Sequence, residues 1–242
     1  PQNPEAPLQY HRLMDFILPL IVGLAIGGGA APRPLGDPGD VVRFGRPILK
    51  LLVNLSIAVV IGALALALWA FSSAEKAYRR AIDIAAASAV VLTIAAAGYL
   101  LFTFLDVSQT PFSFDASFSA SLNLFVTKIG LGQAWLWITL LSAATAVLCF
   151  AVSNQTALFF VGLLGLSPLL PMALTGHSAG ASSHDVAMTS LGLHLVFVAV
   201  WLGGLVALVL LRRRVTPERL IVITQRYSTL ALGAWGCGAF GN

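Results

Sequence analysis

Long apolar runs recur along this chain and constrain its fold more than any other feature. A transmembrane helix needs about 20 mainly apolar residues. Six runs are candidates, and we predict a membrane-spanning helix in each of Phe16–Ala31, Ile48–Phe71, Ala81–Leu105, Leu131–Ser153, Ala157–Leu174 and Val186–Leu211, although the first is short. A seventh run, Ser228–Phe240, is too short to cross a bilayer and is interpreted as the start of a truncated helix. The sequence therefore predicts an all-α, polytopic membrane helix bundle.

The composition supports a membrane location and excludes several function classes. Only 10% of the 242 residues are charged and 58% are hydrophobic, whereas soluble domains carry about 25% charged residues. We therefore expect the lipid bilayer as a partner, and we do not expect a soluble enzyme, a disulfide scaffold or a nucleic-acid-binding protein. The whole chain, 1–242, is interpreted as one membrane domain: an N-terminal helix within 1–31, a main bundle over 48–211 and the truncated helix within 228–242. The first run lacks a basic leader and contains three glycines, so we interpret it as a span and not as a cleaved signal.

The distribution of basic residues predicts the orientation. Loops alternate sides, and nine of the 14 basic residues then fall on the side of the N-terminus: Arg12, Lys76, Arg79, Arg80, Arg212, Arg213, Arg214, Arg219 and Arg226. Five fall on the other side: Arg33, Arg43, Arg46, Lys50 and Lys128. Cytoplasmic loops carry the excess of Lys and Arg, so we predict a cytoplasmic N-terminus and localisation in the cytoplasmic membrane.

Two of the loops on the extracytoplasmic side have local patterns. The loop over 32–47 is rich in Pro, Gly and Asp, which favours turns over a hard-cation site, because two carboxylates cannot supply the six to eight oxygens of calcium. In the second loop, Phe114, Phe118, Leu122 and Phe125 recur at helical spacing. That spacing predicts a short interfacial helix begun by Asp115.

The third extracytoplasmic loop and the helix after it hold the candidate metal ligands. Three of the four histidines, two of the three methionines and one aspartate are gathered there, namely Met172, His177, His184, Asp185, Met188 and His194. Thioether sulfur favours Cu(I), and imidazole also suits Cu(II), zinc and haem iron. Each residue also has a structural interpretation: His177 and His184 as solvated loop residues, Asp185 as a first-turn residue of the helix, and the methionines as core packing.

Helix geometry separates these residues into two groups. His184 and Met188 are neighbours one turn apart at the rim of the sixth span. His194 lies ten residues further on, about 15 Å deeper, and shares its face with Ser190 and Trp201. An ionisable residue inside a span is a functional candidate by default, although His194 could instead be a hydrogen-bonded core histidine.

Three further features are architectural. Pro168 and Pro171 are expected to break the fifth span near its outer end. Gly203 and Gly204 are expected to permit close helix approach. Cys149 is expected to be a small buried residue and not a ligand.

The motifs from Gly176-His177-Ser178-Ala179 through His184-Asp185, and then Leu193-His194 to Trp201-Leu202-Gly203-Gly204-Leu205, resemble the copper resistance D (CopD) family. The upstream Leu35-Gly36-Asp37-Pro38-Gly39 is similar to actinobacterial members, in which a CopD-like half is fused to a half resembling the CtaG cytochrome oxidase assembly factors. The likeness is loose before residue 170 and closer from Thr175 to Leu205. It implies copper as the bound metal, as Cu(I) or Cu(II), and implies roles for His177, His184, Asp185, His194 and Trp201.

These observations lead us to expect a membrane copper-handling protein that is not an enzyme. It would take copper up across the cytoplasmic membrane or supply it to cytochrome oxidase assembly, with an extracytoplasmic copper chaperone or the oxidase as partner. Two alternatives remain. A haem b electron carrier would need a second imidazole facing His194, and a structural subunit of a respiratory complex would need no metal at all.

Overall fold

The computed structural model describes residues 39–174, 184–212 and 215–239. For residue 174, residues 184–191 and residues 230–239 the description is limited to the backbone. The chain divides into two units, residues 1–37 and residues 38–242. The predicted span Phe16–Ala31 and the predicted turn residues of the loop before residue 39 lie outside the described residues.

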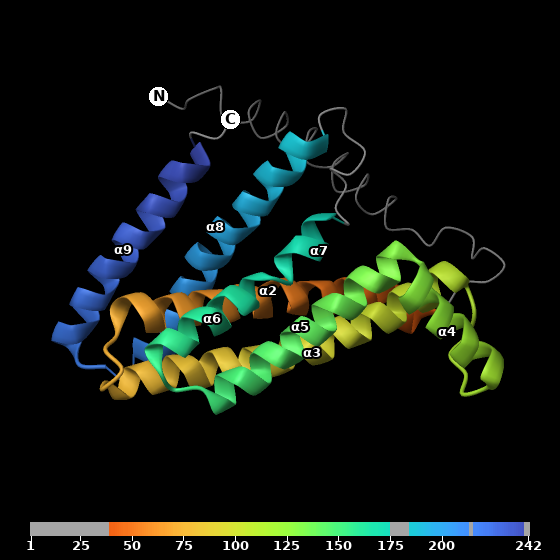
Figure 1. Ribbon diagram of the computed structural model, residues 1–242, viewed down its shortest axis with the longest axis horizontal. Coiled ribbons are helices and arrows are strands. Elements are labelled where there is room, and N and C mark those ends of the chain that lie inside the picture. The colour runs from red at the N-terminus through yellow and green to blue at the C-terminus, as the bar shows by residue number, and fades with distance from the viewer. Residues whose placement is uncertain (1–38, 175–183, 213–214, 240–242) are drawn as a thin grey trace, which may run out of the picture. The chain divides into compact units, whose positions relative to one another are not determined.

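The described chain is helical, and no strand occurs in it. The helices are α2 (Asp40–Ala70), α3 (Lys76–Ser108), α4 (Ala116–Lys128), α5 (Gly130–Ala151), α6 (Gln155–Leu166), α7 (Leu169–Leu174), α8 (His184–Leu211) and α9 (Pro217–Ala239) (Figure 1). Five stretches among the described residues are long and apolar enough to cross a membrane: Asp40–Ala70, Lys76–Ser108, Gly130–Ala151, Gln155–Ala173 and Gly192–Leu211. The chain is therefore an all-helical, multi-pass membrane protein.

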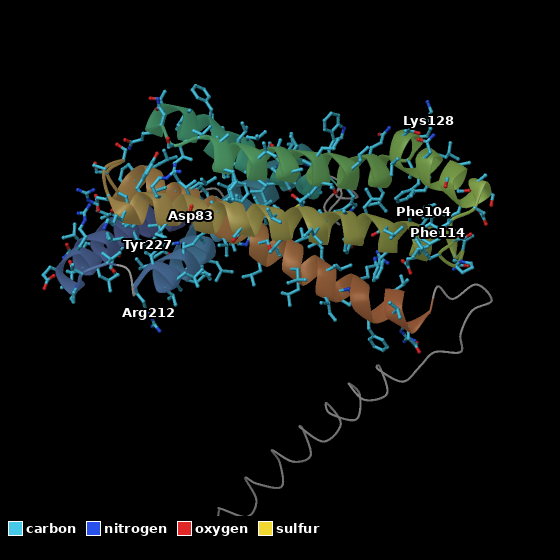
Figure 2. All side chains as sticks on the ribbon, turned by 90° about the horizontal axis from the view of Figure 1, so that it is seen from below. Asp83, Phe104, Phe114, Lys128, Arg212 and Tyr227 are labelled. Carbon is cyan, nitrogen blue, oxygen red and sulfur yellow. The ribbon has the colours of Figure 1, made fainter. Side chains whose placement is uncertain are left out.

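The bundle has two ends. One end, here the α4 end, carries the start of α2, the end of α3, all of α4 and the start of α5, and Figure 2 shows Phe104, Phe114 and Lys128 there. The other, here the turn end, carries the α2–α3 turn and the α8–α9 connection, with Asp83, Arg212 and Tyr227. The helices α6 and α7 run from the turn end back toward the α4 end, and α8 runs from His184 to the turn end (Figure 1).

The helix α2 is central and packs against α3, α6, α8 and α9. Its crossing with α8 is made by glycine on both helices. A Cβ added to Gly62 would overlap backbone atoms of Gly203 and Gly204, and one added to Gly203 would overlap the carbonyl of Ala58. The predicted close approach at Gly203 and Gly204 is therefore confirmed, and only residues without a side chain permit it.

The next helix is positioned through the same glycine pair. A Cβ on Gly204 would lie 2.6 Å from the ring of Tyr227 on α9, and the Tyr227 hydroxyl donates to the carbonyl oxygen of Trp201. The side chain of Tyr227 is buried, and it belongs to the same hydrophobic cluster as Ala207, Leu208 and Leu211 of α8. The lack of a side chain at Gly204 thus makes room for the ring that joins α9 to α8.

An ion pair fastens α9 at the turn end. Arg219 donates to both carboxylate oxygens of Glu75, at 3.1 and 2.7 Å, and to the carbonyl oxygen of Ala70 at 3.3 Å. The hydrogen bond from Arg219 lowers the pKa of Glu75 below its ordinary value, and a backbone hydrogen bond from Ser72 acts in the same direction. The α2–α3 turn is therefore joined to the first turn of α9 by charge-assisted hydrogen bonds.

The helix predicted to begin at Asp115 is confirmed as α4, and its place in the membrane interface stays a prediction. The Asp115 carboxylate caps it by accepting from the backbone N–H of Phe118 at 2.7 Å. Phe118 and Phe125 pack against Phe104 of α3. Phe114 does not join this packing and is 90% exposed, because the helix starts after it.

Two predicted boundaries are wrong at the ends of helices. The helix α2 begins at Asp40 and not at Ile48, so the second half of the predicted 32–47 loop is helical and Pro47 lies inside it. A proline removes one backbone hydrogen bond, and burial of Val42 against Phe104 offsets that loss. The last helix begins at Pro217, eleven residues before Ser228. Proline suits a first helical turn, and the polar residues after it continue the helix without lengthening the apolar run.

The fifth predicted span is interrupted at Pro168, as expected, but the interruption predicted at Pro171 is wrong. The chain leaves α6 at Ser167 and re-enters a helix at Leu169. Pro171 is the third residue of α7. The first N–H groups of a helix have no acceptor within the helix, so a proline at this position removes no hydrogen bond. One proline therefore separates the two helices, and the other lies within a first turn.

Candidate functional site

Met172 is the only side chain of the predicted ligand set that lies before the α7–α8 connection in the described part of the chain. It is half-buried and packs against a hydrophobic cluster that contains Trp135 of α5 and Leu195 and Val196 of α8. The short helix α7 contacts both α5 and α8. This side chain thus joins the core near the segment that carries the histidines, and its role as a ligand stays a prediction.

The backbone places the next candidates in the first turns of α8. That helix is continuous from His184 to Leu211, so the predicted start near residue 183 is confirmed. His184 and Asp185 are its first two residues, and Met188 follows one turn later. His177 lies outside the described residues.

His194 lies ten residues into α8, about 15 Å along the helix from His184 at 1.5 Å per residue. Its side chain is exposed, as are Leu193 and Trp201, the latter at 54%. Half-buried Leu195 and Val196 pack into the bundle instead. The imidazole of His194 is thus not enclosed among the described helices, and its role as a ligand or as a hydrogen-bonded core histidine stays a prediction.

The described residues contain no group of three or more His, Cys, Asp or Glu side chains that could hold a metal ion. Cys149 is buried on α5 and packs in a hydrophobic cluster with Ala146 and Tyr78. Its interpretation as a small buried residue is confirmed.

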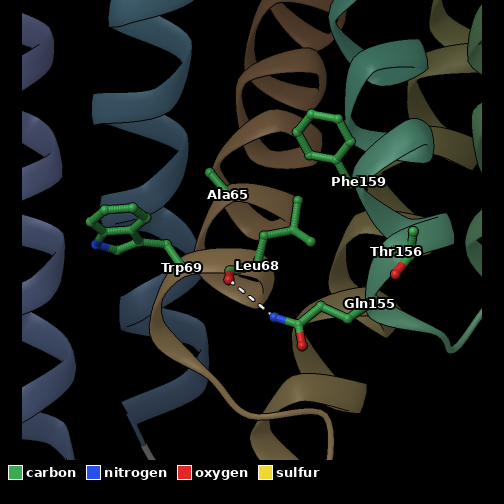
Figure 3. A pocket seen from close by; sticks show the side chains of 6 residues that line it. All are labelled: Ala65, Leu68, Trp69, Gln155, Thr156 and Phe159. Atoms are coloured by element: carbon green, nitrogen blue, oxygen red, sulfur yellow. Dashed lines mark hydrogen bonds between the residues drawn. The ribbon is translucent and has the colours of Figure 1, made fainter.

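A groove at the turn end is distant from these candidates. Its volume is about 540 Å³, and its lining comes from α2 and α6: Ala65, Leu68, Trp69, Gln155, Thr156 and Phe159 (Figure 3). The Gln155 side-chain amide donates to the carbonyl oxygen of Leu68 at 3.5 Å. The lining has no histidine, methionine, cysteine or carboxylate, so the groove offers no soft-metal ligand.

The α4 end also holds a cation–aromatic cluster that the sequence did not reveal. The ammonium of Lys50 on α2 lies 4.6 Å from the ring centroid of Trp135 on α5 and 5.5 Å from that of Tyr99 on α3. The two rings are 4.1 Å apart. These residues are far apart in the sequence, and only the packing of three helices brings them together.

One comparison matches the part of the chain from the start of α2 through the first two residues of α8. The family model described as "copper resistance protein D-like, N-terminal domain" matches residues 41–185. The chain belongs to the copper resistance D-like family. This membership makes it a copper-resistance-type membrane protein and supports an association with copper. No curated protein and no solved structure matches the chain.

The span of the match refines the resemblance found in the sequence. It includes His177, His184 and Asp185, and it also covers α2 to α7, where the likeness was judged loose. It ends before Met188, His194 and the Trp201-Leu202-Gly203-Gly204-Leu205 motif. The importance of these later residues therefore rests on the resemblance and on their place in α8.

Proposed function

We propose that this protein binds copper at the end of the bundle where α7 ends and α8 begins, and passes it along α8 within the membrane. His177, His184 and Asp185 would capture the ion, and His194 would receive it. Membership of the copper resistance D-like family carries this proposal, because the family match extends over the bundle and through the first two residues of α8.

The position of His194 supports two stations instead of one. The helix α8 is continuous between His184 and His194, so about 15 Å of helix separates them, and one ion cannot contact both side chains. Met172 and Met188 are thioethers near the first station, which suits Cu(I). The exposed imidazole of His194 is a nitrogen donor that suits copper at the second station.

The biological role that fits best is copper uptake across the cytoplasmic membrane or copper supply to cytochrome oxidase assembly, without a catalysed reaction. An extracytoplasmic copper chaperone or the oxidase would be the partner. The cytoplasmic N-terminus inferred from the basic residues puts the start of α8 outside the cytoplasm, where such a chaperone would deliver its ion. The fusion to a CtaG-like half belongs to the same proposal.

Elemental analysis of the purified protein beside its visible absorption spectrum tests the proposal. We expect copper in stoichiometric amount after loading with Cu(I) and no Soret band. A Soret band would identify a haem carrier instead, and neither metal nor haem would favour a structural subunit.

Histidine variants then locate the ligands, with His11→Ala as a matched control because His11 is far from the α7–α8 connection in the sequence. The double variant His177→Ala, His184→Ala should lose copper from the first station and keep its melting temperature. His194→Ala should keep copper binding at the first station and fail to support copper-dependent oxidase maturation. Normal maturation with a lowered melting temperature in His194→Ala would remove this residue from the site.

A further inference from the structure

Three basic side chains lie together on the first half of α2. Arg43, Arg46 and Lys50 are three and four residues apart, so they share one face of the helix. The exposed apolar side chains of the same stretch, among them Phe44 and Ile48, lie on another face. We call Arg43, Arg46 and Lys50 the α2 basic face.

Lys50 is the most enclosed cation of this face. Its side chain is half-buried, and its ammonium is held near the rings of Trp135 and Tyr99 at 4.6 and 5.5 Å from their centroids. The guanidinium carbon of Arg46 lies 5.8 Å from the Tyr99 ring on the same side. Cation–π attraction orients these groups, but the rings carry no net charge, so the positive charge is not neutralised.

Carboxylates neutralise only part of the α2 basic face. Arg46 forms an ion pair with Asp106 at the end of α3. Among the described residues, neither Arg43 nor Lys50 has a carboxylate oxygen within salt-bridge distance. A partly buried ammonium without a counter-ion is costly, and an anion beside it would recover that cost. The charge arrangement therefore favours a bound anion between the open donors of Lys50, Arg43 and Arg46.

The depth of the cluster indicates where that anion comes from. Lys50 directly precedes the uncharged apolar stretch 51–71 of α2, and Asp106 closes the corresponding stretch of α3. Trp and Tyr concentrate at the level of lipid headgroups. The cluster thus lies at the boundary between hydrocarbon and headgroups.

We propose that the α2 basic face, together with Tyr99 and Trp135, binds the phosphate of an anionic phospholipid headgroup. Lys50 and Arg46 donate hydrogen bonds to phosphate oxygens, the bonds that ammonium and guanidinium groups make most strongly. The competing interpretation is that Lys50 merely extends toward the membrane surface, as basic residues near helix ends do. That interpretation predicts no preference between headgroups.

Native mass spectrometry of the full chain, purified in detergent and depleted of lipid, tests this proposal. Phosphatidylglycerol is compared with phosphatidylcholine of the same acyl chains, so that only the headgroup charge differs. We expect tighter binding of phosphatidylglycerol by the unaltered protein, and an affinity lower by about fivefold in Lys50→Gln, because one basic side chain near an anionic surface contributes about that factor. Lys50→Arg should retain the preference.

Arg80→Gln is the matched control, because Arg80 is an exposed cation of α3 at the turn end. It should bind both lipids as the unaltered protein does, and melting curves of all variants should report a folded chain. Equal affinity for the two lipids, or an equal loss in Arg80→Gln and Lys50→Gln, would overturn the proposal. Displacement of phosphatidylglycerol by millimolar inorganic phosphate would also overturn it and assign the site to a soluble oxyanion.

Discussion

The crossing of α2 and α8 makes a sharp prediction about Gly203. In Gly203→Ala the new methyl group overlaps the Ala58 carbonyl. The distance between them is well below 3.0 Å, and Cβ atoms in real structures essentially never come that close to another heavy atom. The backbone cannot rotate away as a flexible side chain does. Because the added Cβ would overlap the Ala58 carbonyl oxygen, the two helices must separate by roughly 2 Å to restore ordinary contacts of about 3.5–4.0 Å. The α2–α8 packing that positions the start of α8 would loosen with them.

The magnitude follows from two opposing terms. Overpacking of a filled interior costs about 1–3 kcal/mol, and backbone overlap places Gly203→Ala at the upper limit of about 3. Replacing a helical glycine by alanine returns about 1 kcal/mol. The net expectation is a loss of about 2 kcal/mol in the free energy of unfolding.

Gly192→Ala is the matched control on the same helix, because a Cβ there meets no atom within 4 Å. It should be neutral or up to about 1 kcal/mol more stable. Reversible unfolding of both variants in mixed detergent micelles measures the difference, expected at about 3 kcal/mol. Equal stability of Gly203→Ala and Gly192→Ala would refute the glycine crossing.

Three further predictions concern the ends of the bundle. Because Arg219 lowers the pKa of Glu75, the stability that this pair contributes should be fully present above the ordinary carboxylate pKa of about 4.3. It should be lost as the pH falls through the lower pKa of the folded state. A Glu75→Gln variant whose melting temperature has the same acid dependence as that of the unaltered protein would contradict this. Asp115→Ala removes the cap of α4 and should speed amide hydrogen exchange of the first turn of α4 while leaving α5 unchanged; Ser117→Ala, which removes one hydroxyl donor to the same carboxylate, should have a smaller effect. Cysteine placed at Ser182 should react with a membrane-impermeant thiol reagent in intact cells, because the distribution of basic residues predicts that the segment between α7 and α8 lies outside the cytoplasm. Labelling only after permeabilisation would contradict the predicted orientation.

The apolar runs predicted the helices because a segment that spans the membrane must be apolar and about 20 residues long, and both properties can be read from the sequence. The helix at Asp115 was predictable as well, since a capping aspartate and an apolar repeat of period 3.6 act over a few residues. The sequence did not predict that α2 begins at Asp40 or that α9 begins at Pro217, because both starts lie in polar sequence where hydropathy gives no signal. Tertiary contacts such as Val42 against Phe104 determine where such polar extensions stay helical.

The candidate site was predictable only as a list of residue types. The gathering of His and Met after Pro171 indicated soft-metal chemistry, and helical arithmetic separated His194 from His184. That His194 is exposed could not be inferred from the sequence, because every side of α8 is apolar and none stands out as the buried face. The cluster of Lys50, Tyr99 and Trp135 was missed for a related reason: its members come from three helices, and no local spacing connects them.

The glycine crossing links the fold to the proposed copper path. The backbones of α2 and α8 touch at Gly62 and Gly203, nine residues beyond His194, and α9 is fixed to the same turn of α8 through Tyr227. The inner part of α8 is thus the fixed part. Toward His184 the helix is held mainly by half-buried Leu195, Val196 and Val200, and by its contact with α7. Because α8 is continuous, fixing its inner half sets the depth of His194 and the position of His184 together. In the proposed two-station path, this anchoring keeps the two stations at a fixed spacing and depth, and Gly62 and Gly203 supply it without a polar group in the membrane.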